Sequence, residues 1–182
     1  MSSRHRVFIS YHHANDENYK NIFELRFGNS ADVIVRGSVQ IGDINPDANT
    51  EYIRQRVRDD YLRNSSVTVV LVGTETWQRK HVDWEIYSSL RDTSANPRSG
   101  LIGILLPSYS STQRPGGYNK YTIPPRLADN IECGFAQLYA WSNDADTVAG
   151  WIHDAYLRKS RVQPNNARPM FAKNRTGERW YD

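Results

Sequence analysis

The sequence has one cysteine, no long apolar run and only a small excess of positive charge. A single cysteine, Cys133, excludes an internal disulfide and fits a reducing compartment. We interpret it as a small buried side chain rather than a catalytic thiol. The longest apolar runs, at residues 67–72 and 101–106, have the length of strands, whereas a helix that spans a bilayer needs about 20 apolar residues. The first residues lack the apolar stretch of a secretory signal. We therefore expect a cytoplasmic protein that does not interact with membranes.

The positive charge is concentrated at one end of the chain. Residues 158–182 contain seven Lys or Arg and two Asp or Glu, and the net charge of the whole chain is +3. Residues 1–157 therefore carry a net charge of −2, which gives no basic surface for nucleic acid in the body of the protein. We predict one domain over residues 1–157, followed by a basic, polar and solvated tail over residues 158–182.

Several common catalytic and binding motifs are missing. The sequence has neither the glycine-rich turn of ordinary dinucleotide-binding folds nor a P-loop. It also has no Gly-x-Ser-x-Gly elbow of a serine hydrolase. A phosphoacceptor domain would need acidic residues where the chain has Tyr11, His12 and His13. Because the two histidines and Cys133 form no zinc pattern, we predict no metal site and expect solvent-facing loop histidines.

Strand-like and helix-like segments alternate along the chain. β-Branched and aromatic runs predict strands near residues 6–11, 32–36, 67–72, 101–106 and 135–141. The two central runs are apolar without alternation, which is typical of parallel strands covered on both faces. We therefore predict an α/β fold, a flavodoxin-like or TIR-like three-layer sandwich with a mainly parallel, five-stranded sheet.

Two segments between the strands bear on function. Val82, Ile86 and Leu90 recur at helical spacing and predict a short helix over residues 82–90. Residues 107–130 contain four prolines, and we interpret them as a long ordered loop at the carboxyl end of the sheet. We expect its tyrosines, Tyr109, Tyr118 and Tyr121, to form a rim of the site or an assembly surface.

Three segments together resemble the TIR domain family, in particular the TIR-like proteins of bacterial Thoeris anti-phage defence. They are Arg-Val-Phe-Ile-Ser-Tyr-His at residues 6–12, the strand and its exit at residues 64–77, and Lys-His-Val-Asp-Trp-Glu-Ile at residues 80–86. Their order and spacing agree with the family, and the resemblance covers roughly residues 5–157. The sequence departs from many TIR enzymes at His81, where they have Trp, and at Arg36, where an acidic residue is common.

The resemblance implies an enzyme that cleaves NAD between nicotinamide and ribose, with NAD as substrate and no cofactor. Glu85 is then the catalytic carboxylate, although helical spacing alone would make it a surface residue beside His81. The resemblance places Phe8, Ser10, Tyr11 and Ser38 in the substrate pocket. Strand alternation puts Phe8 and Ser10 on one face of the sheet and Tyr11 on the other. Phe8 and Trp77 are equally compatible with the core, whereas Ser38 fits a turn better than a contact with the nucleotide.

The resemblance also implies partners. A cyclic ADP-ribose-type messenger would activate a separate effector protein, after self-association or a phage-derived trigger has switched the enzyme on. Attack by water instead of adenine would give linear ADP-ribose, and the sequence does not separate the two. The alternative function is a non-catalytic TIR-like interaction module, which the replacements at His81 and Arg36 favour and the presence of Glu85 opposes.

Overall fold

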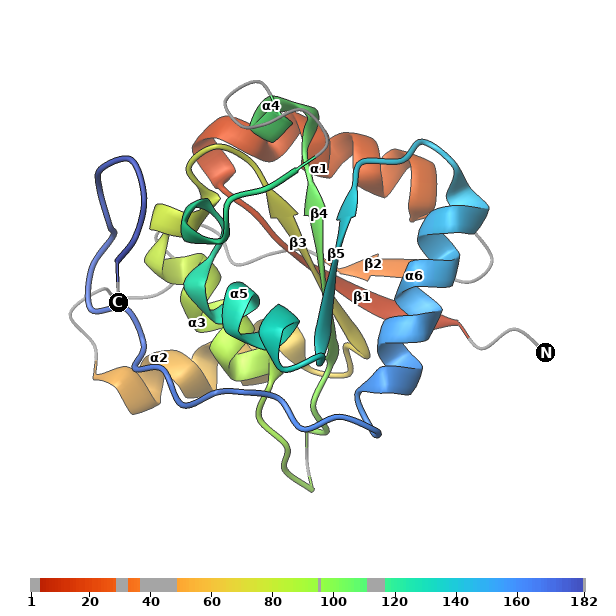
Figure 1. The fold of residues 1–182 in the computed structure, drawn as a ribbon. Coiled ribbons are helices and arrows are strands. Elements are labelled where there is room, and N and C mark those ends of the chain that lie inside the picture. Colours follow the sequence, from red (N-terminus) through yellow and green to blue (C-terminus); the bar gives the residue numbers. More distant parts are fainter. Residues whose placement is uncertain (1–3, 29–32, 37–48, 95, 111–116, 182) are drawn as a thin grey trace.

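The computed structural model describes residues 4–28, 33–36, 49–94, 96–110 and 117–181 (Figure 1). Its strands are β1 (His5–Ser10), β2 (Val33–Arg36), β3 (Val67–Val72), β4 (Gly100–Leu105) and β5 (Ala136–Ala140). Its α-helices are α1 (His13–Phe27), α2 (Thr50–Arg56), α3 (Lys80–Ser89), α4 (Pro107–Ser110), α5 (Pro125–Glu132) and α6 (Ala145–Arg158). Three shorter helical turns complete the order, a π-helical turn η1 (Val57–Leu62) and the 3-10 turns η2 (Thr76–Gln78) and η3 (Lys120–Thr122).

The five strands form one sheet in the order β2-β1-β3-β4-β5, and every neighbouring pair is parallel. The register aligns Ser10, the last residue of β1, with Val70 of β3. The predicted α/β fold with a parallel sheet is confirmed. Because parallel strands end at the same edge, the loops after β1 and β3 meet there, which is where ligands bind in such sheets.

Helices cover both faces of the sheet. On one face, α1 and α6 pack through Phe23, Phe27, Val148 and Ile152. On the other face lie α3, α5 and η1 (Figure 1). β3 is buried along its whole length, and its residues alternate between the two cores, so Val69 contacts the first and Val70 the second. The apolar runs that lacked alternation in the sequence are thus strands enclosed between two helical layers.

The prediction of a long loop over residues 107–130 is wrong at both ends, because α4 occupies its start and α5 its end. Pro125 occupies the first turn of α5, where a proline costs little because the N–H that it lacks has no partner inside the helix. Leu127 and Ala128 bury the inner face of that helix. Tyr109 is also buried, at 1% exposure, so it does not contribute to the rim predicted from the sequence, whereas Tyr118 is exposed.

The C-terminal segment is not a solvated tail. Residues 159–181 contain no helix or strand, yet Phe171 and Trp180 are buried, and the segment runs across α3 and α5 (Figure 1). Trp180 donates a hydrogen bond to the carbonyl of Ile123 over 2.8 Å. The segment packs through its aromatic residues, its backbone and some of its polar side chains, among them Arg168, which forms an ion pair with Asp129 over 2.8 Å.

In the part of the chain that the structure describes, no helix combines the length and the apolar character that crossing a bilayer requires.

The close packing of α6 on β4 gives a direct test of the fold. A Cβ atom at Gly100 would lie 2.3 Å from the carbonyl oxygen of Ala155 in α6. We expect Gly100→Ala to lower the free energy of unfolding by about 1–3 kcal/mol, measured by urea denaturation, because the backbones must separate. Gly150→Ala, in open space on the same helix, is the control. We expect it to raise stability by up to about 1 kcal/mol. Equal effects of both variants would contradict this packing.

Candidate active site

The candidate site lies where β1 ends beside α3. Phe8 and Ser10 point to the face that α3 covers, whereas Val7 and Ile9 belong to the core under α1 and α6. Ser10 is fully buried, at 0% exposure. The alternation expected from the sequence therefore holds along this strand.

Two sides of α3 are buried, one in the apolar core and one against β1. Val82 and Ile86 pack into the core against β3 and β4. Glu85 lies one position from Ile86, about 100° around the helix, and is also fully buried, at 0% exposure. The prediction of a surface position from helical spacing alone is wrong, because β1 lies against this side of α3 as well.

Ser10 and Glu85 are joined directly. The Ser10 hydroxyl donates a hydrogen bond to Oε2 of Glu85, across 75 residues of sequence. A buried carboxylate is costly unless hydrogen bonds stabilise its charge. The end of β1 thus supplies a hydrogen-bond donor to the buried carboxylate of Glu85.

The other residues predicted to line the pocket are Phe8, Tyr11 and Ser38, and the two that the structure describes are core residues. Phe8 packs against Val57, Leu62 and Trp84, which makes it a core residue under α3. Tyr11 is buried on the opposite side of β1, in the core under α1 and α6, and its backbone carbonyl lies 3.0 Å from Nε2 of His81 in α3. Ser38 lies outside the described residues.

The sequence model of the family described as "Thoeris protein ThsB, TIR-like domain" matches residues 8–111. This match spans more than half of the chain, from Phe8 in β1 through the Ser10–Glu85 pair to the end of α4. The chain belongs to this family. It is a TIR-like protein of Thoeris anti-phage defence, as the three segments that resemble the family suggested. No curated protein matches the sequence.

Two histidines follow the end of β1 and a third lies in the first turn of α3, next to the site. His12 and His13 are 5% and 9% exposed, so the expectation of solvent-facing loop residues is wrong. The His13 and His81 rings lie 4.7 Å apart, centroid to centroid. Burial lowers the pKa of both His12 and His81 to about 4. These imidazoles are therefore neutral at physiological pH and add no positive charge near Glu85.

Asp16 fixes the loop that connects β3 to α3. It lies in the first turn of α1, and it is 2% exposed. The Thr76 hydroxyl lies 3.4 Å from Oδ2 of Asp16 and accepts a hydrogen bond from the backbone N–H of Gly73 over 2.8 Å. A Cβ atom at Gly73 would lie 2.4 Å from Oδ2, so any larger residue there would displace the Asp16 carboxylate. Nothing in the local sequence marks this contact, because its partners are 60 residues apart.

Asp16 predicts a pH-dependent stability. Burial raises its pKa from 3.8 to about 6. Since the folded-state pKa exceeds the unfolded one, its stabilising contribution is complete below pH 3.8 and is lost as the pH rises through about 6. We expect Asp16→Asn to raise the melting temperature relative to wild type at pH 8 and to have a smaller effect at pH 5. The exposed neighbour Glu17→Gln is the control. A difference between Asp16→Asn and wild type that is independent of pH would contradict the assignment.

Proposed function

We propose that this chain cleaves the bond between nicotinamide and ribose in NAD, with Glu85 as the catalytic carboxylate. The observation that carries the proposal is the buried Glu85 beside Ser10 at the carboxyl end of the parallel sheet. The family match covers both residues. A carboxylate held in a dry site by a neighbouring hydroxyl is suited to stabilising a positive charge that develops next to it.

The chemistry requires one carboxylate and no general acid. When the C1′–N bond breaks, its electron pair goes to the pyridinium nitrogen, so nicotinamide departs neutral without taking a proton. The positive charge that remains is spread over C1′ and the ring oxygen of ribose. Ordinary glycosidases need a second carboxyl group to protonate a leaving oxygen. Here Glu85 stabilises the cation, and Ser10 orients its carboxylate.

The neutral histidines fit a cationic substrate. The pyridinium ring of NAD carries a positive charge, and protonated imidazoles beside it would repel it. Burial keeps His12 and His81 neutral at physiological pH. Nε2 of His13 is buried without a hydrogen-bond partner among the described residues, and it is a candidate to bind a polar group of the substrate.

The proposed product is a cyclic ADP-ribose-type messenger, formed when adenine attacks C1′ from within the same molecule. The burial of Glu85 and Ser10 supports this outcome, since a site that excludes water disfavours hydrolysis to linear ADP-ribose. The messenger then activates a separate effector protein. Because Glu85 is inaccessible in this structure, substrate entry requires a conformational change, which self-association or a phage-derived trigger would provide.

The alternative is a non-catalytic interaction module, which would recruit partners without acting on NAD. The complete burial of Glu85 favours it, because a carboxylate bound to Ser10 also serves to fasten α3 to β1. The two functions differ in the need for charge at position 85. A fastening role needs only a hydrogen-bond acceptor, whereas catalysis needs the negative charge.

Glu85→Gln separates the two functions. The variant keeps the acceptor for Ser10 and removes the charge, so we expect the rate of nicotinamide release to fall by about 10²–10³. NAD affinity should change less, because the charge matters most once the cation has formed. The assay is chromatography of nicotinamide, with purified protein at increasing concentration and with extract of phage-infected cells added. Glu132→Gln, at an exposed position, is the control. If activated wild type released no nicotinamide, or if Glu85→Gln matched wild type, the interaction module would take the place of the enzyme.

A further inference from the structure

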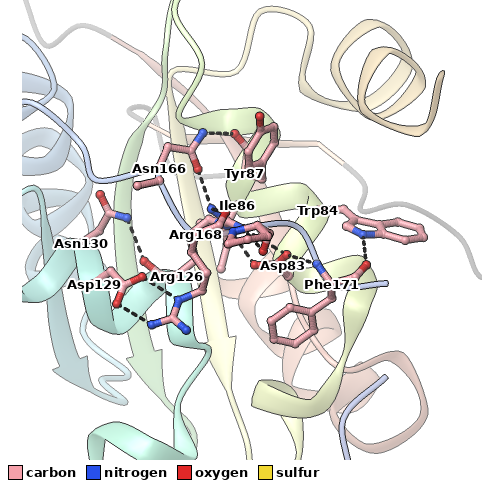
Figure 2. Close-up of polar contacts among 12 residues, drawn as sticks. Asp83, Trp84, Ile86, Tyr87, Arg126, Asp129, Asn130, Asn166, Arg168 and Phe171 are labelled. Carbon is pink, nitrogen blue, oxygen red and sulfur yellow. Dashed lines mark hydrogen bonds and ion pairs between the residues drawn. The ribbon is translucent and has the colours of Figure 1, made fainter. Parts of the chain in front are cut away.

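The C-terminal segment is bound along the length of the helix that carries Glu85. Residues 165–175, the strap, run in the opposite direction to α3. Near one end, the Asn166 side chain donates to the carbonyl of Tyr87 over 3.1 Å. In the middle, the Trp84 indole donates to the carbonyl of Phe171 over 2.9 Å (Figure 2). At the other end, the Asn174 side chain accepts from the backbone N–H of Lys80 over 2.9 Å.

A buried ion pair connects the strap with α3 and α5. Nε of Arg126, in α5, donates to Oδ1 of Asp83, in α3, over 2.9 Å, and Nη2 donates to Oδ2 over 3.3 Å (Figure 2). Both side chains are buried, at 0% and 2% exposure. Oδ2 of Asp83 also accepts the backbone N–H of Phe171 over 2.9 Å. The strap therefore contributes a backbone donor to the charge that anchors α3.

The remaining donors of Arg126 go to the strap. Nη1 donates to Oδ1 of Asn166 over 2.9 Å and to the carbonyl of Arg168 over 2.8 Å, and Nη2 donates to the carbonyl of Pro169 over 3.1 Å. A guanidinium has five N–H groups, and the Asp83 and strap contacts give each an acceptor. Such complete pairing fixes the strap and the two helices in one arrangement, because any shift would leave a buried donor without a partner.

The strap also completes the start of α3. Arg79, at the N-cap position, makes no side-chain hydrogen bond to the helix. The first N–H groups of a helix have no partner within it, and Asn174 supplies an acceptor for that of Lys80. A residue 94 positions away in the sequence thus does what an N-cap residue ordinarily does.

These contacts restrain the rotation of α3 about its own axis. Lys80, Asp83, Trp84 and Tyr87 are three or four residues apart, so they form one side of the helix, and all of them contact the strap. A second side, with Val82 and Ile86, is held by the sheet. Glu85 emerges from a third side, toward Ser10. The strap therefore fixes the direction in which the Glu85 carboxylate points.

We propose that the strap and Arg126 are positioning groups for Glu85, so that the C-terminal segment is a working part of the site and not an appendage. This inference rests on the proposed NAD cleavage. Reacting groups tolerate little displacement, and an error of about 1 Å can lower a rate about 10²-fold. None of Arg126, Asn166, Phe171 or Asn174 lies within the part of the chain that the family match covers.

The test removes three strap hydrogen bonds, those of Asn166 with Tyr87 and Arg126 and that of Asn174 with Lys80, and keeps both hydrogen bonds between Arg126 and Asp83. In Asn166→Ala/Asn174→Ala, we expect kcat for nicotinamide release to fall at least about 10-fold, with KM within about twofold, because the carboxylate is misdirected and the substrate site remains. Hydrogen exchange of the α3 amides should accelerate, while that of β3 and β4 stays unchanged.

Two further variants complete the test. Restoring the cap with Asp, in Asn166→Ala/Asn174→Asp, should recover part of the lost kcat and part of the lost protection from exchange. Lys173→Ala, at an exposed strap position, is the matched control and should resemble wild type in both readouts.

The outcomes separate this inference from the function on which it rests. A double variant with wild-type kcat, despite faster exchange in α3, would overturn the positioning role while NAD cleavage stands. Unchanged exchange in α3 would show that the strap does not hold the helix, and would also overturn it. A wild type that releases no nicotinamide would refute the proposed enzyme, whereas exchange would still report whether the strap restrains α3. A fall in kcat that follows only the folded fraction, measured by thermal denaturation at the assay temperature, would show a purely structural strap.

Discussion

Much of this structure depends on the position of α3 against the end of β1. The helix is short, from Lys80 to Ser89, and it carries a buried carboxylate that must be hydrogen-bonded. Ser10 supplies one hydrogen bond, and the sheet and the strap hold two other sides of the helix. Small displacements of α3 would therefore break several buried contacts together, which gives Glu85 a defined position.

The parallel sheet explains why the site forms where it does. β1 and β3 are neighbours, so the loops that follow them leave the sheet at the same edge. Asp16, after β1, fastens the exit of β3 through Thr76, and His81 contacts the backbone carbonyl of Tyr11. The groups at this edge are largely withdrawn from water. That burial lowers the pKa of the histidines and raises that of Asp16, and it leaves Glu85 in surroundings that suit a transition state with a positive charge.

The sequence predicts the features that repeat along it. Strands such as residues 67–72 are continuous apolar runs, and the period of Val82 and Ile86 identifies α3. Resemblance, rather than period, pointed to Glu85. α5 was missed because its prolines resemble those of a loop, although Pro125 followed by Leu127, Ala128 and Ile131 is a pattern that marks a helix start. The strap was missed for a different reason. Its partners, such as Phe171 and Asp83, are 88 residues apart and leave no periodic pattern.

The central claim is that Glu85 faces the ribose of NAD when the bond to nicotinamide breaks. A crystal structure of Glu85→Gln bound to NAD tests it most directly, because the substituted side chain slows turnover and leaves the shape of the site in place. The account predicts that C1′ of the nicotinamide ribose lies beside residue 85 and Ser10, with α3 still held by the strap. NAD bound away from residue 85, with the pair of side chains at positions 10 and 85 still buried, would contradict it.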